Sequence, residues 1–330
     1  MSEREKLFEE FPPISTEEWM DRIRSDLKGS DFSSRLVWKT SMGFDVMPFY
    51  RKEDIENLKY IHVEPGEFPY IRGKRCDNSW RIRQDLKVTD YASANAKALR
   101  IVRDGIDSLG FYLADPESIN RENLDILLSG IDPETTELNF LSDGRAKELV
   151  TAFIESTGNF LPERIKGAVE TDPLGRLMLN GTLCIPVGKG FDYLAEVAGL
   201  TAGLPLFRAI HLNAANMRNA GADIVTELAF ALSMAAEYLY GLAERGIDPG
   251  MAAQKIRFSF GTGSEYYPGI AGLRAARLLW PVILSGFGIE VCSMKPMEIH
   301  CSTMRINKSM NDPYVNMLRT QTEAMSAILG

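Results

Sequence analysis

A repeated alternation of short apolar strands with longer helices most strongly limits the folds open to this chain. Seven such units follow one another from residue 80 to the C-terminus. Parallel strands need a crossover helix between them, so this alternation predicts a parallel sheet in an α/β protein. The predicted strands are "WRIRQDLK" (80–87), "GFYLAD" (110–115), "ELNFLSD" (137–143), "IKGAVETDP" (165–173), "LFRAIHLNAAN" (206–216), "KIRFSFGTG" (255–263) and "MEIHCSTMR" (297–305).

Seven units in a row favour a TIM-type (β/α)₈ barrel over an open doubly wound sheet. Because the pattern contains seven strands, we expect a barrel that lacks its eighth strand, with a gap between strands 80–87 and 297–305. Each buried unpaired backbone group at such an edge costs about 1–3 kcal/mol. We therefore expect dimerisation, or infilling by non-barrel residues. The last helix is predicted to be capped by Asp312, with Pro313 at its first position.

The chain divides by composition into an N-terminal helical arm with a lead-in loop (1–79) and the incomplete barrel (80–330). Strand-like alternation around Gly43 predicts a short β-segment in the arm. The lead-in "HVEPGEFPYIRGKRCDNSW" (62–80) is rich in proline and glycine but too aromatic for a disordered linker, so an ordered loop is predicted.

The arm begins with a predicted helix, "FPPISTEEWMDRIRSDLKG" (11–29). Either Ser15 or Thr16 can cap its N-terminus. Trp19, Ile23 and Leu27 follow at four-residue spacing and share one face. That face must be buried, either against the chain's own body or against a partner.

Charge and composition exclude several classes of function. The net charge of −8 disfavours a nucleic-acid partner. No apolar run is long enough to span a membrane, and the first ten residues, "MSEREKLFEE", lack an apolar signal core. The four cysteines show no CxxC spacing, which indicates reduced thiols and a cytoplasmic location.

The common catalytic and binding motifs are incomplete or absent in this sequence. Gly261 and Gly263 fit a dinucleotide fingerprint, but Tyr266 stands where the third glycine belongs. We expect these glycines to let the backbone turn closely at the barrel mouth. Adjacent His300 and Cys301 point to opposite faces of a strand, so core positions are favoured over a metal site. No nucleophile elbow GxSxG occurs.

Two expectations concern the barrel interior. Arg81, Arg83 and Asp85 share one face of the first strand, and the two arginines could form an ion network with Glu170 or Asp172. Large side chains are expected to fill the barrel axis. The expected inward positions, which depend on the pleat, are Arg81 or Ile82, Phe111, Phe140, Phe258 and Phe260.

The stretch "HLNAANMRNAGADI" (211–224) reads as a strand end, a polar turn and a helix start. A barrel enzyme places its chemistry at such turns. This turn, however, offers asparagines, an arginine and small residues, with no acid or base of its own.

Several motifs together resemble the methylmalonyl-CoA mutase family over nearly the whole chain. Segments 11–29 and 36–50 are similar to the small-subunit branch of that family in particular. The motifs that carry the wider resemblance are "PGEFPYIRG" (65–73), "WRIRQ" (80–84), "NAGADIVTELAFAL" (219–232), "LRAARLLWP" (273–281) and "DPYVNMLRTQTEAMSAILG" (312–330).

The resemblance implies an N-terminal barrel followed by a C-terminal domain that binds adenosylcobalamin through a DxHxxG motif. That motif and domain are absent from these 330 residues. In catalytic members the turn reads like "GYHMQEAG", so Ala215 replaces a tyrosine and Asn216 a histidine. Asp85 takes the position of a second active-site tyrosine. The resemblance therefore implies a chain with no catalytic, cofactor-binding or metal-binding residues, which is inactive alone and binds no adenosylcobalamin.

The implied role is a non-catalytic small subunit that stabilises a large catalytic subunit in a heterodimer. The large subunit interconverts methylmalonyl-CoA and succinyl-CoA by adenosylcobalamin radical chemistry. Two alternatives remain open: an active acyl-CoA mutase of altered specificity, and a stand-alone barrel enzyme without cobalamin. A homodimer of this chain is a further expectation.

Overall fold

The computed structural model describes residues 11–141 and 144–330. They belong to two compact units, one ending at Ile61 and one running from His62 to Gly330. The lead-in loop thus groups with the second unit, whereas composition grouped it with the arm. The charged segment 1–10 and the end of the predicted strand 137–143, at Ser142 and Asp143, lie outside the described residues.

The first unit contains the predicted helix, and the predicted β-segment forms a short antiparallel pair. The hydroxyl of Ser15 accepts a hydrogen bond from the Glu18 N–H, and the Glu18 carboxylate accepts one from the Ser15 N–H, at 3.1 and 3.0 Å. This capping box starts the first helix, as expected for Ser15. The elements are α1 (Thr16–Asp26), α2 (Phe32–Leu36), the antiparallel pair β1 (Trp38–Lys39) and β2 (Asp45–Val46), and α3 (Lys52–Ile55).

The second unit is built on parallel strands, and every predicted strand is found in its place. The strands follow chain order in two sheets, β3-β4-β5-β6-β7 and β8-β9-β10. Their bounds are β3 (Arg83–Val88), β4 (Ser108–Leu113), β5 (Glu137–Leu141), β6 (Gly167–Val169), β7 (Phe207–Arg208), β8 (Ile210–Asn213), β9 (Ile256–Thr262) and β10 (Ile299–Thr303). The mixed α/β class with a parallel sheet is therefore confirmed.

A break in the fifth predicted strand separates the two sheets. Ala209 lies between β7 and β8, and the N–H groups of Ala209 and Ile210 both donate to the Lys255 carbonyl at 3.0 Å. The His211 N–H donates to the Thr171 carbonyl just after β6, at 3.3 Å. The two sheets therefore continue into one another around residues 207–213.

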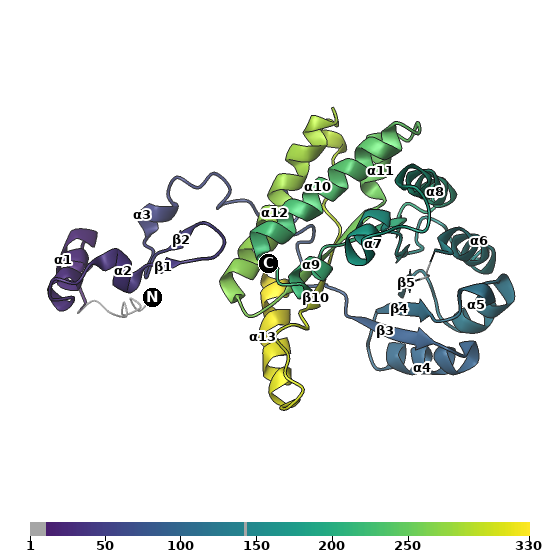
Figure 1. Ribbon diagram of the computed structural model, residues 1–330, viewed down its shortest axis with the longest axis horizontal. Helices are drawn as coiled ribbons and strands as arrows, with labels where there is room; N and C mark the ends of the chain where they lie inside the picture. Colours follow the sequence, from purple (N-terminus) through teal and green to yellow (C-terminus); the bar gives the residue numbers. More distant parts are fainter. Residues whose placement is uncertain (1–10, 142–143) are drawn as a thin grey trace, which may run out of the picture. The chain divides into compact units, whose positions relative to one another are not determined.

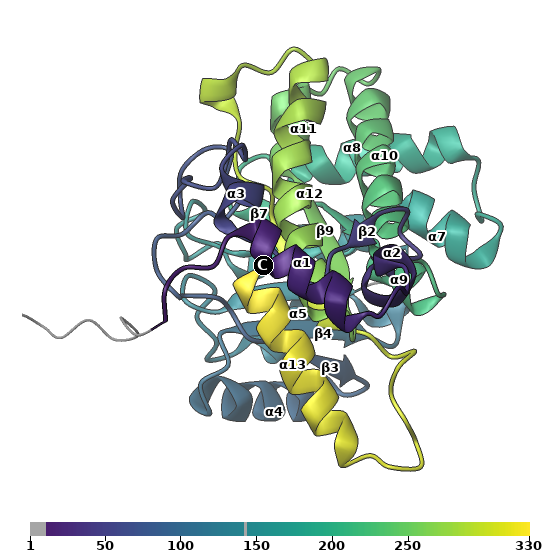
Figure 2. The same ribbon diagram turned by 90° about the vertical axis from the view of Figure 1, so that its left-hand side faces the viewer.

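Helices form one successive layer beside the strands. Each of α4, α5, α6, α8, α10, α12 and α13 packs against the next in this order; Figure 1 shows α4, α5, α6 and α8, and Figure 2 shows α10, α12 and α13. The helices of this unit are α4 (Tyr91–Arg103), α5 (Arg121–Leu128), α6 (Ala146–Ser156), α7 (Pro173–Asn180), α8 (Val187–Leu200), α9 (Ala215–Asn219), α10 (Ile224–Ala243), α11 (Pro249–Gln254), α12 (Tyr266–Gly286) and α13 (Val315–Leu329), with short 3₁₀ turns η1 (Pro116–Ser118) and η2 (Val291–Ser293).

The start of the last helix differs from the prediction. α13 begins at Val315 after Tyr314, so Pro313 precedes the helix instead of occupying its first turn. The Asp312 carboxylate accepts only a long hydrogen bond, 3.4 Å, from the Val315 N–H.

The expectation that phenylalanine side chains point inward and fill the barrel axis is wrong. Phe111 and Phe140 stack on one another, and Phe140 contacts Phe153 of α6 with ring centroids 5.2 Å apart. Phe258 likewise contacts Trp280 of α12 at 5.1 Å. These rings therefore form the core between sheet and helices, and the opposite face of the strands carries other side chains.

The strands β3 and β10 end the two sheets, and no pairing joins them within the described residues. Part of the lead-in loop lies beside the β10 edge: Lys74 pairs with Glu298, the residue before β10, and Arg277 of α12 donates to the Ile71 carbonyl at 3.5 Å. These contacts place part of the loop near β10 and α12, and infilling of the edge stays a prediction. None of the helices within 11–141 and 144–330 has the length and apolar content to span a bilayer.

A buried polar face and the strand-end turn

The face of the sheet opposite the phenylalanines carries polar and charged side chains. We call it the polar face and define it by six residues: Glu137, Asn139, Glu170, His211, Arg257 and Ser259. All except Glu170 are at most 7% exposed. Arg257 of β9 reaches both Glu137 and Asn139 of β5. Since β6 and the β7–β8 segment lie between these strands, the sheet must curve strongly around this face.

Glu137 is the centre of one ion network on the polar face. Its carboxylate accepts hydrogen bonds from Arg81 at 2.8 Å, Arg257 at 2.6 Å and the Ser108 hydroxyl at 2.7 Å. Burial opposes ionisation of Glu137, but Arg257 and Arg81 outweigh it and lower the pKa to about 2. Arg81 thus joins an internal network as predicted, but with Glu137 in place of Glu170 or Asp172.

Glu170 is the centre of a second network, which confirms the predicted partner of Arg83. Arg83 donates to the Glu170 carboxylate at 2.8 Å and to Asp85 at 2.7 Å. Nδ1 of His211 lies 2.8 Å from the same Glu170 oxygen, although without hydrogen-bond alignment. Burial raises the pKa of Glu170, but His211 and Arg83 outweigh it and lower the pKa to about 2.

The arrangement Glu170–His211–Ser259 has the connectivity of an acid, a base and a nucleophile. Nε2 of His211 and the Ser259 hydroxyl share a short hydrogen bond. Both of these residues are at most 3% exposed, so a substrate cannot reach the hydroxyl. Sequence reasoning missed this set, because its members lie on or just after three different strands. We therefore interpret Glu170, His211 and Ser259 as part of the buried polar face and not as a catalytic set.

The remaining histidine of this region is neutral. His300 of β10 lies edge-on to His211, with ring centroids 6.2 Å apart. Burial and the nearby charge of Arg83 lower the pKa of His300 to about 3.

The turn that follows β8 is held by a buried aspartate. Asp172, after β6, accepts hydrogen bonds from the Tyr238 hydroxyl, from the Asn213 N–H at 3.0 Å and from the Gly175 N–H at 2.9 Å. Burial raises the pKa of Asp172 against these hydrogen bonds. These contacts fix the ends of β6 and β8 beside α7 and α10.

The three predicted replacement positions lie on two separate elements, β3 and α9. Ala215 and Asn216 begin α9, directly after β8, and Ala215 is buried. Asp85 lies in β3, where it accepts the Arg83 hydrogen bond and lies against Gly110. No hydrogen bond or ion pair joins Asp85 to Ala215 or Asn216 in the part of the chain that the structure describes.

Arg218 is the charged residue that this turn buries. It donates to Glu265 at 2.7 Å and to the Ala222 carbonyl at 2.7 Å, and its Nε lies 3.7 Å from Glu227. A Cβ on Gly261 would lie 2.9 Å from the Arg218 Cβ, and one on Gly263 would lie 3.4 Å from its Nη2. Gly261 therefore makes room for Arg218 at the strand end, whereas a Cβ on Gly263 would first meet the Met304 sulfur, at 2.6 Å.

Glu227 completes this cluster from α10. Its carboxylate accepts the Gly261 N–H at 2.7 Å. Burial raises the pKa of Glu227 to about 8, against that hydrogen bond and the charge of Arg218. Neither the sequence motif nor the glycine spacing pointed to this buried carboxyl group.

Parallel strands in chain order, a layer of successive helices and a strand-end turn define an α/β protein with a parallel central sheet. Its sequence relatives give the family. A profile of the methylmalonyl-CoA mutase family matches residues 118–330. This chain belongs to that family.

Individual relatives agree with this assignment. The chain is 42% identical to the methylmalonyl-CoA mutase small subunit of Porphyromonas gingivalis, over 99% of this chain and 53% of that protein. It is 26% identical to the mitochondrial methylmalonyl-CoA mutase of Homo sapiens, over 99% of this chain and 47% of that protein. The large subunit from Streptomyces virginiae is also 26% identical, over 97% and 47%. The chain thus spans about half the length of the curated relatives it matches.

Proposed function

We propose that this chain is the barrel part of a non-catalytic small subunit that pairs with a catalytic large subunit of methylmalonyl-CoA mutase. The observation that carries the proposal is the buried polar face. The family resemblance implies that in catalytic subunits the pantetheine chain of coenzyme A runs along the barrel axis. In this chain the side chains of the polar face are ion-paired or hydrogen-bonded, and all except Glu170 are at most 7% exposed.

Opening a path along this face is energetically unfavourable. Arg257 bridges Glu137 and Asn139, and Arg83 bridges Glu170 and Asp85. Removing one partner of a buried ion pair typically costs about 3–5 kcal/mol, because the other charge stays buried and unpaired. A pantetheine chain would have to displace several such pairs.

The strand-end turn supports the same proposal. Asn216 cannot act as a general acid at neutral pH, whereas histidine can. Ala215 provides no ring, and an ionised Asp85 would repel the carboxylate of the substrate. Arg218 is held by Glu265 at the strand end, which leaves it poorly placed to move toward a substrate.

The residues of this chain do not fit adenosylcobalamin. A cobalt-ligating histidine must present a free ring nitrogen. His211 is 3% exposed, its Nε2 is bound to Ser259 and its Nδ1 lies 2.8 Å from Glu170, so neither ring nitrogen is open to a ligand, and His300 lies beside it. His62 is exposed but is not part of a DxHxxG motif. We infer that cobalamin in the complete enzyme is held by other residues than these.

The fold proposal is a (β/α)₈ barrel that lacks its eighth strand, with β7 and β8 counted as one strand. The curvature of the polar face and the free edges of β3 and β10 support it. A parallel strand inserted between these edges would pair both rows of backbone groups. A cytoplasmic location remains a prediction.

The first unit supports the partner proposal. None of its described residues is buried, and Trp38 and Tyr50 are 52% and 60% exposed. So many exposed aromatic side chains in a small unit are typical of a surface that another protein covers. We propose that the large subunit is the protein that covers this surface.

The test is co-expression of the chain with its large subunit, followed by native mass spectrometry and assay of methylmalonyl-CoA turnover with adenosylcobalamin. We expect a heterodimer, and turnover only when the large subunit is present. Trp38→Ala should weaken the heterodimer, whereas Tyr267→Ala, at an exposed tyrosine of the second unit, should not. Turnover by this chain alone would overturn the proposal and favour an active mutase of altered specificity. Formation of a homodimer without any heterodimer would overturn the proposal that the large subunit is the partner.

A further inference from the structure

The last helix, α13, has its polar side turned inward (yellow in Figure 2). The Glu323 carboxylate, which is 1% exposed, accepts hydrogen bonds from the Lys308 ammonium group through both of its oxygens, at 2.6 Å. The buried Ser326 hydroxyl donates to the Tyr266 carbonyl at 2.8 Å. These contacts fix the rotation of α13 about its own axis, so its opposite side must face outward.

The outer side of α13 carries an exposed stripe that is mostly apolar. We call it the α13 stripe, and its members are Met317, Leu318, Gln321, Met325, Ile328 and Leu329. Exposed Tyr314 extends the stripe just before the helix begins. The members recur every three or four residues, so they lie on one side of a helix about 22 Å long. Amphipathic helices normally bury their apolar side, so the α13 stripe is expected to be covered by another molecule.

None of the members of the α13 stripe is charged. The two ionisable side chains of the helix, Arg319 and Glu323, lie off the stripe and have partners: Arg319 donates to the Asn316 side chain at 2.9 Å, and Glu323 is paired with Lys308. The chain has a net charge of −8, so two copies repel one another overall. An uncharged stripe is therefore a surface at which a second copy can approach without local repulsion.

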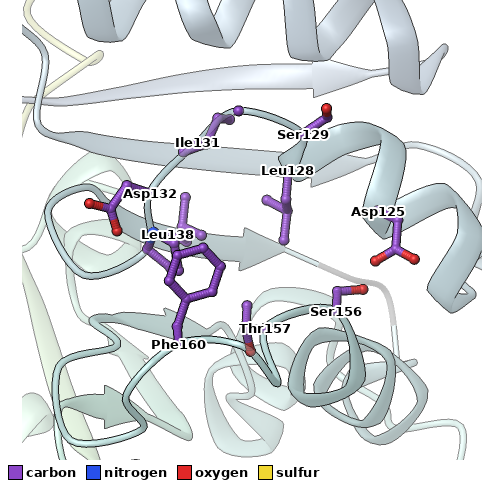
Figure 3. Close-up of a pocket in the computed structure, with 11 residues that line it drawn as sticks. Asp125, Leu128, Ser129, Ile131, Asp132, Leu138, Ser156, Thr157 and Phe160 are labelled. Carbon is purple, nitrogen blue, oxygen red and sulfur yellow. The ribbon is translucent and has the colours of Figure 1, made fainter.

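A second apolar surface of this unit lacks that property. A cavity of about 340 Å³ lies between α5, α6 and β5, and Leu128, Leu138 and Phe160 contribute to its wall (Figure 3). Asp125 and Asp132 also line it, and Figure 3 shows them on opposite sides. Two copies that met at this cavity would bring carboxylates of the same sign together, which is unfavourable. The α13 stripe is thus the better contact surface for a second copy.

Gln321, the polar member of the α13 stripe, favours a two-fold arrangement. It lies at the middle of the stripe, seven residues after Tyr314 and seven before Ile328. If two copies of α13 pack antiparallel about a two-fold axis, the residue at the middle faces its own copy. A side-chain amide both donates and accepts, so two facing Gln321 side chains satisfy one another, whereas a charged residue there would meet its own charge.

We propose that the α13 stripe binds a second copy of this chain, with the two-fold axis at Gln321. The apolar side chains on either side of Gln321 then pack on those of the other copy, and Tyr314 of one copy lies toward Ile328 of the other. One helix stripe is small beside a standard interface of about 800 Å² per partner, so we expect a reversible homodimer in the micromolar range. The inference does not rest on the proposed mutase role, because the surface proposed for the large subunit lies in the first unit.

The test is sedimentation velocity of the 330-residue chain alone, at about 1 to 200 µM, with charge variants at the proposed axis. We expect the wild type to pass from monomer to dimer in this range. Gln321→Glu and Gln321→Lys each place like charges opposite one another, so each should raise the dissociation constant at least about tenfold. An equimolar mixture of the two variants should restore dimerisation, because opposite charges then meet at the axis.

Thr320→Glu and Thr320→Lys are the matched controls, because Thr320 is exposed and projects about 100° away from Gln321 around the helix. Each should change the dissociation constant by no more than about twofold. Circular dichroism of each variant shows that it is folded before sedimentation.

The proposal is overturned by a monomer at every concentration, by equal effects of the substitutions at Thr320 and Gln321, or by a mixture of the two Gln321 variants that stays monomeric. If the chain alone is monomeric and Gln321→Glu instead prevents its capture by the large subunit, the α13 stripe belongs to that protein and the homodimer is refuted.

Discussion

Replacement of Glu137 by glutamine tests the energetics of the polar face most directly. The substitution keeps the shape of the side chain but removes the charge that Arg81 and Arg257 share. Ionisation of Glu137 is coupled to folding, because its pKa falls from 4.5 to about 2 in the folded protein. One pKa unit corresponds to about 1.4 kcal/mol, so the ionised carboxylate contributes about 3 kcal/mol of stability near neutral pH.

We therefore expect Glu137→Gln to lower the free energy of unfolding by about 3 kcal/mol at pH 7, measured by urea denaturation with circular dichroism. The sign of the pH dependence follows from the lowered pKa. The contribution is present above pH 4.5 and is lost as the pH falls toward 2, so the difference between wild type and variant should shrink in acid.

Glu163→Gln is the control, since Glu163 is exposed, and it should change stability by no more than about 0.5 kcal/mol. A loss below about 1 kcal/mol for Glu137→Gln, or a loss that does not shrink in acid, would refute the view that this network is an essential ion-paired interior.

Three further substitutions test other buried groups. Glu227 has its pKa raised to about 8, so wild-type stability should decrease as the pH rises from about 4.5 to 8, and Glu227→Gln should flatten this dependence in thermal melts. A wild-type melting temperature that is constant over this range would contradict the raised pKa. Lys255→Met removes an ammonium group that donates to the carbonyls of Thr201 and Leu204, and it should cost about 2 kcal/mol or more in urea denaturation. Tyr238→Phe removes a hydrogen bond to a buried aspartate and should cost about 1–3 kcal/mol by the same measurement, whereas an unchanged midpoint would show that this bond does not hold the turn.

The sequence alone determined which segments become strands and helices. Period-two and period-3.6 patterns are local, and they placed all seven predicted strands of the second unit, the fifth of which the structure divides into β7 and β8. Local side-chain chemistry also fixed the start of α1, because the Ser15–Glu18 capping box involves residues three positions apart. Arg83 with Glu170 was foreseen because charges on a buried strand need partners.

Which face of each strand turns toward the helices was decided only by the tertiary structure. In a parallel sheet both faces are covered, so alternation defines two faces without saying which is inside. The phenylalanines pack on the helices, and Arg257 and Glu137 meet only because the sheet curves across two intervening strand segments. The meeting of His211 with Ser259 depends in the same way on strand register, which a single sequence does not carry.

The strand-end turn shows the same division between local and long-range causes. The sequence of residues 211–224 was enough to show that the turn has no acid or base of its own. That Arg218 is buried there depends on Glu265 from another loop, on Glu227 from α10 and on the space left by Gly261. Burial of a charge is decided by partners brought together from distant segments, because without them its desolvation would be prohibitive.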